Sequence, residues 1–158
     1  MAPLHARMAG HVDINLNGQD RSVDFAPGTS LLQLLRNELG LRSMKDGCAP
    51  EGSCGACTVI VDGRPVVSCA QPAERFEGKA IETLEGLPED ARDLWADAFS
   101  ATGASQCGYC TPGIVMKAEA LLRREAEPEQ DTITKALAGN LCRCTGYLSI
   151  VDAIGQVA

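Results

Sequence analysis

The chain has 158 residues, of which 45 % are hydrophobic and 22 % charged, and its formal net charge is −7. This acidity argues against a nucleic-acid partner, because no basic stripe is present to displace counterions from phosphates. We find no secretory signal from Met1 to His11 and no apolar run long enough to cross a membrane, so we expect a cytoplasmic protein without a membrane partner. Eight cysteines in a reducing compartment favour metal or redox chemistry over disulfide bonds.

The first half of the chain alternates between apolar and polar residues, which is typical of β-strands. Asn17-Gly18 predicts a hairpin turn, and Ser30 with Gln33 predicts a capping box at the start of a helix. The elements expected here are strands over 12–16 and 23–25, a helix over 30–40, and strands over 58–61, 65–69 and 80–84.

The pattern becomes helical after a boundary near residues 85–89. Thr111 followed by Pro112 predicts an N-cap and a first helical residue. Leu94 is expected to face inward with Ala98 and Phe99. The helices expected are 90–102, 111–124, 132–138 and 147–156. The whole pattern predicts an α+β fold divided into units of residues 10–85 and 86–158.

The first four cysteines have the spacing C-x5-C-x2-C-x11-C, close to the plant-type ferredoxin spacing of C-x4-C-x2-C and a distant fourth cysteine. Three ligands from one loop must wrap an inorganic cluster while backbone N–H groups turn toward its sulfurs. Such a loop needs unusual backbone dihedrals, which glycine permits, and the fourth cysteine is expected on the far strand of a hairpin. The residues concerned are Cys48, Cys54, Cys57 and Cys69, with glycines at Gly47, Gly52 and Gly55.

The last four cysteines have the spacing C-x2-C-x31-C-x1-C. The first pair comes just before a predicted helix and the second pair just after one. Free N–H groups at the start of a helix favour an anionic cluster. These cysteines are Cys107, Cys110, Cys142 and Cys144.

Two structural zinc ions are the main alternative, because zinc also accepts four thiolates. The C-x-C pair and the 11-residue gap are atypical of zinc ribbons, in which C-x2-C pairs dominate. A Rieske centre needs two histidine ligands, and the only histidines, His5 and His11, fall in an expected N-terminal tail. We see no Ser/His/Asp or Cys/His arrangement for nucleophilic catalysis, so we assign no catalytic residue.

Three segments resemble the iron–sulfur subunits of molybdenum hydroxylases, the family of xanthine dehydrogenase, aldehyde oxidoreductase and carbon monoxide dehydrogenase. They are CAPEGSCGACTVIV over Cys48–Val61, followed by Asp62-Gly63 and Ser68-Cys69, then QCGYCTP over Gln106–Pro112 and NLCRCTGY over Asn140–Tyr147. Three motifs in this order and at this spacing are highly specific.

The resemblance implies a plant-ferredoxin-like β-grasp domain followed by a four-helix bundle, with one [2Fe–2S] cluster in each. It also implies that the cluster of the helical half lies beside a molybdopterin, in its cytosine dinucleotide form, on a large subunit. Gln106 and Cys144 would approach this pterin. The other cluster would lead to FAD on a medium subunit, in a dimer of heterotrimers.

We therefore interpret the chain as the electron-transfer subunit of a molybdenum hydroxylase, which relays single electrons from molybdopterin through two [2Fe–2S] clusters to a flavin. The alternatives are a free-standing ferredoxin-type carrier and a zinc-stapled interaction module. One departure from the family is the first gap, which has five residues, 49–53, where most relatives have four. We expect a wider turn to absorb the extra residue.

Overall fold

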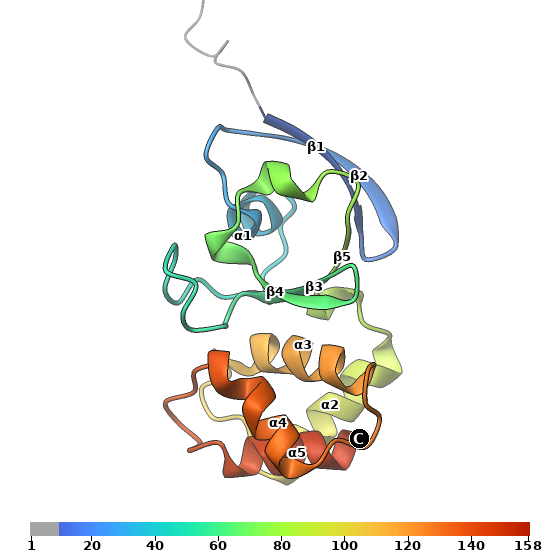
Figure 1. The fold of residues 1–158 in the computed structure, drawn as a ribbon, viewed down its shortest axis with the longest axis vertical. Coiled ribbons are helices and arrows are strands. Elements are labelled where there is room, and N and C mark those ends of the chain that lie inside the picture. The colour runs from blue at the N-terminus through green and yellow to red at the C-terminus, as the bar shows by residue number, and fades with distance from the viewer. Residues whose placement is uncertain (1–9) are drawn as a thin grey trace, which may run out of the picture.

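The structure, a computed structural model, describes residues 10–158 and is an α+β arrangement. A five-stranded sheet with α1 beside it forms one end of the molecule, and α2 to α5 form the other (Figure 1). The strands are β1 (Gly10–Leu16), β2 (Gln19–Phe25), β3 (Thr58–Val61), β4 (Arg64–Val67) and β5 (Ala80–Glu82). The helices are α1 (Leu31–Gln33), α2 (Glu89–Ala101), α3 (Thr111–Leu122), α4 (Gln130–Ala136) and α5 (Leu148–Val157). Single turns complete the chain: η1 (Leu34–Glu38), η2 (Ser68–Ala70), η3 (Ala73–Phe76), η4 (Leu84–Gly86) and η5 (Leu137–Gly139).

The sheet has the strand order β2-β1-β5-β3-β4. The outer hairpins β1–β2 and β3–β4 are antiparallel, and β5 lies between them, parallel to β1 and antiparallel to β3. The predicted turn at Asn17-Gly18 is confirmed, since both residues have positive φ, as a two-residue hairpin turn requires. The alternation seen in the sequence is also confirmed, because every second residue of β1 from Val12 to Leu16 is buried.

The helix that covers the sheet begins at the predicted capping box. The Ser30 hydroxyl accepts a hydrogen bond from the Gln33 amide, and the Gln33 side chain accepts one from the Ser30 amide. Helix α1 then widens into a π-helical turn, η1, which the sequence did not predict. Leu31, Leu34 and Leu35 are fully buried against the sheet and form the centre of its apolar core.

The second half has its own apolar core, formed between the helices. Helix α3 lies along the β3–β4 hairpin (Figure 1), so its buried face joins the two halves. Trp95 and Phe99 of α2 meet edge to face, with ring centroids 6.1 Å apart. Leu94 is half exposed, so the prediction that it faces inward was wrong: the larger Trp95 beside it takes the buried direction instead.

Three local predictions also need correction. The N-cap of α3 is Cys110, and Thr111 is already helical. Strand β4 ends at Val67, so Cys69 lies in η2 and not on the strand. His11 lies on β1 and not in a tail, while His5 is outside the described residues. Among residues 10–158, no helix is both long enough and apolar enough to span a membrane.

Candidate metal centres

The first four cysteines come together where the loop 47–57 meets η2. The amides of Ser53 and Cys54 both donate to Cys48 Sγ at 3.3 Å, and the Cys69 amide donates to Cys57 Sγ at 3.4 Å. The thiols of Cys48 and Cys54 contact each other, as do those of Cys57 and Cys69. The site therefore consists of two thiol pairs with backbone donors already directed at sulfur.

The loop glycines have two different roles. Gly52 and Gly55 have φ of +66° and +69°, so the prediction of left-handed backbone is correct for both. Gly47 has no such φ. It provides space instead, because a Cβ there would lie 3.0 Å from Cys54 Sγ.

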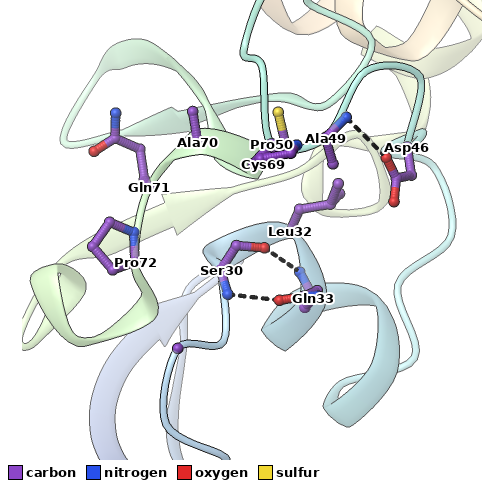
Figure 2. Close-up of a pocket in the computed structure, with 11 residues that line it drawn as sticks. Ser30, Leu32, Gln33, Asp46, Ala49, Pro50, Cys69, Ala70, Gln71 and Pro72 are labelled. Carbon is purple, nitrogen blue, oxygen red and sulfur yellow. Dashed lines mark hydrogen bonds between the residues drawn. The ribbon is translucent and has the colours of Figure 1, made fainter.

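The tip of this loop projects outward. Ala49, Pro50 and Glu51 are exposed, and a turn closes between the Glu51 amide and the Cys48 carbonyl at 2.7 Å. Figure 2 shows Ala49 and Pro50 on the wall of a surface pocket of about 510 Å³ beside Cys69, where the Ala49 amide donates to Asp46. The tip has room at the surface, so a five-residue gap is compatible with the thiol pairs.

The second set of cysteines also gathers in one place, although 31 residues separate its halves. Cys107 and Cys110 lie at the start of α3, and Cys142 and Cys144 follow η5. The sulfurs of Cys107 and Cys144 are 3.6 Å apart, and the side chains of Cys110 and Cys142 are neighbours. This again gives two pairs. The pocket around them, about 460 Å³, is lined by Cys107, Tyr109, Cys110, Leu141, Cys142, Arg143, Cys144 and Tyr147.

Tyr147 fixes the loop that carries the second pair, a role that the sequence analysis did not identify. Its hydroxyl accepts a hydrogen bond from the Cys142 amide at 2.9 Å and donates to the Asn140 carbonyl at 3.1 Å. The Thr145 hydroxyl is 3.3 Å from Cys142 Sγ. Only the NLCRCTGY motif as a whole could have pointed to these residues, since no periodic pattern marks them.

Gln106 lies on the exposed rim of the second site. Its side-chain amide donates to the Cys144 carbonyl at 3.2 Å. Cys107 and Cys144 are exposed, whereas Cys110 and Cys142 lie deeper. The two residues that the resemblance associates with a pterin are therefore neighbours on the open side of this site.

The ionisation of the thiols is uneven in both sites. Burial raises the pKa of Cys69 and of Cys110 to about 12. Hydrogen bonds from Cys54 and Ser53 lower the pKa of Cys48 to about 7. Burial alone would raise the pKa of Cys142, but hydrogen bonds from Thr145 outweigh it and lower that pKa to about 7. Each site thus has one thiol that ionises near neutral pH and one that a bound cation would have to deprotonate.

The donor set fits a binuclear iron–sulfur cluster. Four thiolates in two pairs match two irons with two cysteines each, and amide donors to sulfur complete the surroundings of such clusters. Within residues 10–158, no three cysteine, histidine or carboxylate side chains surround a single point as ligands of one ion would. The thiol contacts in both sites are pairwise.

Outside these sites, a serine, a histidine and two aspartates form a hydrogen-bonded group on the surface. His11 Nδ1 is 2.7 Å from Asp24 and its Nε2 is 3.0 Å from the Ser22 hydroxyl, on the exposed face of β1 and β2. The Ser22 hydroxyl donates to Asp13 at 2.6 Å. All of these side chains are exposed at the surface.

Comparison with known proteins agrees with this chemistry. Residues 14–85 match the family "2Fe-2S iron-sulfur cluster binding domain", and residues 83–155 match "[2Fe-2S] binding domain". The chain is 49 % identical over 144 residues to the nicotinate dehydrogenase small FeS subunit of Eubacterium barkeri, covering 90 % of this chain and 91 % of that protein. It is 44 % identical to the xanthine dehydrogenase iron–sulfur-binding subunit of Escherichia coli O157:H7, with coverages of 90 % and 91 %.

A solved structure gives the same result in three dimensions. A chain of quinoline 2-oxidoreductase from Pseudomonas putida 86 superposes with a TM-score of 0.88 at 38 % identity, covering 93 % of this chain and 91 % of that one. The fold and the thiol sites thus define an iron–sulfur component of an oxidoreductase. More narrowly, the chain belongs to the family of small [2Fe–2S] iron–sulfur subunits of molybdenum hydroxylases.

Proposed function

We propose that this chain relays single electrons through two [2Fe–2S] clusters between a molybdopterin and a flavin on partner subunits. The observation that carries the proposal is the gathering of eight thiols into two sites, each made of two pairs. The ligands of one cluster would be Cys48, Cys54, Cys57 and Cys69, and those of the other Cys107, Cys110, Cys142 and Cys144.

We further propose that the chain divides into a plant-ferredoxin-like β-grasp domain, residues 10–85, and a four-helix bundle, residues 86–158. The mixed sheet crossed by a single helix supports the first assignment, and the four helices around one apolar core support the second. The residue ranges of the two family matches overlap only at residues 83–85, which lie at this proposed boundary.

The protein's part in the chemistry is to hold and tune the clusters, which supply one-electron redox chemistry when bound. Amides of Ser53, Cys54 and Cys69 donate to sulfur in the first site, and such donors stabilise the added negative charge of a reduced cluster. In the second site the Thr145 hydroxyl makes a similar contact. The start of α3 adds the positive end of a helix dipole.

The proposed direction of transfer is the one that the family resemblance implies, and the exposure of the second site supports it. Cys107 and Cys144 lie on an open rim with Gln106, so this side would face a molybdopterin, as its cytosine dinucleotide, on a large partner subunit. Electrons would then pass to the first site and on to FAD on a medium subunit. A dimer of heterotrimers in the cytoplasm is the assembly we propose.

The substrate would be chosen by the large partner. The relatives are named for nicotinate, xanthine and quinoline enzymes, and chains this similar serve enzymes with these different names. Oxidation at molybdenum, with water as the source of oxygen, would take place outside this chain.

Purification of the native complex tests this function. The chain should copurify with a molybdenum-containing subunit, be red-brown, and bleach with dithionite. A colourless chain that contains two zinc ions would overturn the redox assignment. A red-brown chain that runs alone, without molybdenum, would support a free ferredoxin-type carrier instead.

A further inference from the structure

The two thiol sites are joined by a direct contact between their loops. The Leu141 amide donates to the Cys54 carbonyl at 2.9 Å, so a residue next to one ligand of the second site binds the backbone of a ligand of the first. A Cβ on Gly55 would lie 2.3 Å from the Gly139 carbonyl, which shows how closely the loops approach. The shape of the first loop therefore depends on the second.

Asn140 makes the side-chain part of this contact. It is 3 % exposed, and its Nδ2 donates to the Gly55 carbonyl at 3.1 Å. Gly55 lies between two ligands of the first site, and its carbonyl also accepts from the amide and the hydroxyl of Thr58, at 3.1 and 2.7 Å. The Gly55 carbonyl thus accepts three hydrogen bonds. Two come from Thr58, which directly follows the first loop, and the third comes from Asn140 in the other half of the chain.

Tyr147 holds the backbone of Asn140 in place. Its hydroxyl donates to the Asn140 carbonyl and accepts from the Cys142 amide. Hydrogen bonds thus link the Cys142 amide to the Tyr147 hydroxyl, that hydroxyl to the Asn140 backbone carbonyl, and the Asn140 side chain to the Gly55 carbonyl of the first loop.

We propose that Asn140, although it belongs to the motif of the second site, is a positioning residue of the first site, and that Tyr147 orients it. The inference rests on the proposed function, since it assumes a cluster in each site. Asn140 touches neither the thiols of the first site nor a substrate. It fixes the carbonyl between Cys54 and Cys57, and with it the directions of their sulfurs.

The test is Asn140→Asp in the holo complex, read by EPR and by redox titration of each cluster. The substitution keeps size but replaces the donor with an oxygen that repels the Gly55 carbonyl. The first-site signal should change its g values and its midpoint potential, although the substituted residue lies outside that loop. Asn17→Asp is the matched control: Asn17 also bridges distant segments through a part-buried amide, to Thr83 at 3.1 Å, and it should leave both signals unchanged.

An unchanged first-site spectrum and potential in an iron-replete Asn140→Asp complex would overturn the inference. If that variant does not assemble, Tyr147→Phe decides, because it removes the hydroxyl that binds both the Asn140 carbonyl and the Cys142 amide and leaves the first loop itself unchanged. A changed first-site signal would then support the role and an unchanged one would refute it. A wild-type complex that lacks two [2Fe–2S] signals would refute the proposed function itself, which separates the two failures.

Discussion

At the scale of single residues, the structure separates the cysteines by depth. Cys57 and Cys69 are buried in the half of the chain that contains the sheet, whereas Cys107 and Cys144 are exposed on the helical half. The burial that raises the pKa of Cys69 is the same burial that would shield a cluster from water. The two sites should therefore behave as separate metal centres with different surroundings.

This separation predicts selective losses from two matched serine variants. Cys144→Ser should abolish the EPR signal of the second site and leave that of the first, while Cys54→Ser should do the reverse, because each removes one proposed ligand of one cluster. Loss of both signals from either variant would show that the sites do not form independently.

Gln106 gives a prediction that concerns the partner. Gln106→Ala removes an exposed amide that donates to the Cys144 carbonyl, so both iron–sulfur signals should persist. The molybdenum EPR signal of the complex should change, since we place this rim against the pterin. An unaltered molybdenum signal would argue against that contact.

At the scale of elements, the close approach of α3 to the first loop can be tested by adding one carbon. A Cβ on Gly113 would lie 2.3 Å from the Gly55 carbonyl, so Gly113→Ala should destabilise the chain by about 1–3 kcal/mol, the usual cost of overpacking. Gly155→Ala is the control, because a Cβ there meets nothing within 4 Å and should stabilise helix α5 by about 0.5–1 kcal/mol. Thermal unfolding of the two variants measures the difference, and equal melting temperatures would contradict the packing.

Glu85 gives a pH-dependent prediction about the segment that leads into the first site. Burial alone would raise its pKa, but hydrogen bonds from the hydroxyl and amide of Ser43 outweigh it and lower the pKa below the ordinary value of 4.5. A lowered pKa means that the charged form stabilises the fold above the ordinary value, and that this contribution is lost as the pH falls through the folded value.

Glu85→Gln should therefore lower the melting temperature at pH 7, and the difference from wild type should shrink below about pH 4.5, the unfolded value. Melting curves of both proteins at several pH values provide the measurement. A difference in melting temperature that is constant with pH would mean that the charge of the Glu85 carboxylate does not strengthen its hydrogen bonds with Ser43.

Local sequence patterns were enough to predict the strands, the Asn17-Gly18 turn and the capping box at Ser30, because each of these features depends on neighbours within a few residues. The π-helical turn η1 and the exposed side of Leu94 were missed, since packing against distant elements decides them. The cysteine spacing led us to predict two groups of four thiols. It could not predict the bond from Asn140 to Gly55, whose partners are 85 residues apart.

At the scale of the whole molecule, two apolar cores are joined by α3 and by the contact between the two cysteine loops. An ion pair reinforces this arrangement at the other end of α3, where Arg123 binds both oxygens of Glu82 at 2.9 and 3.0 Å. The contact between the two cysteine loops therefore holds the two sites next to each other, as the proposed relay requires.

The most direct test of this account is metal and sulfide analysis of the purified native complex, combined with EPR during stepwise reduction. The account predicts about four iron atoms and about four sulfides per copy of this chain, and two distinct signals that appear at different potentials. Zinc in place of iron, or a single signal with half that iron, would contradict it.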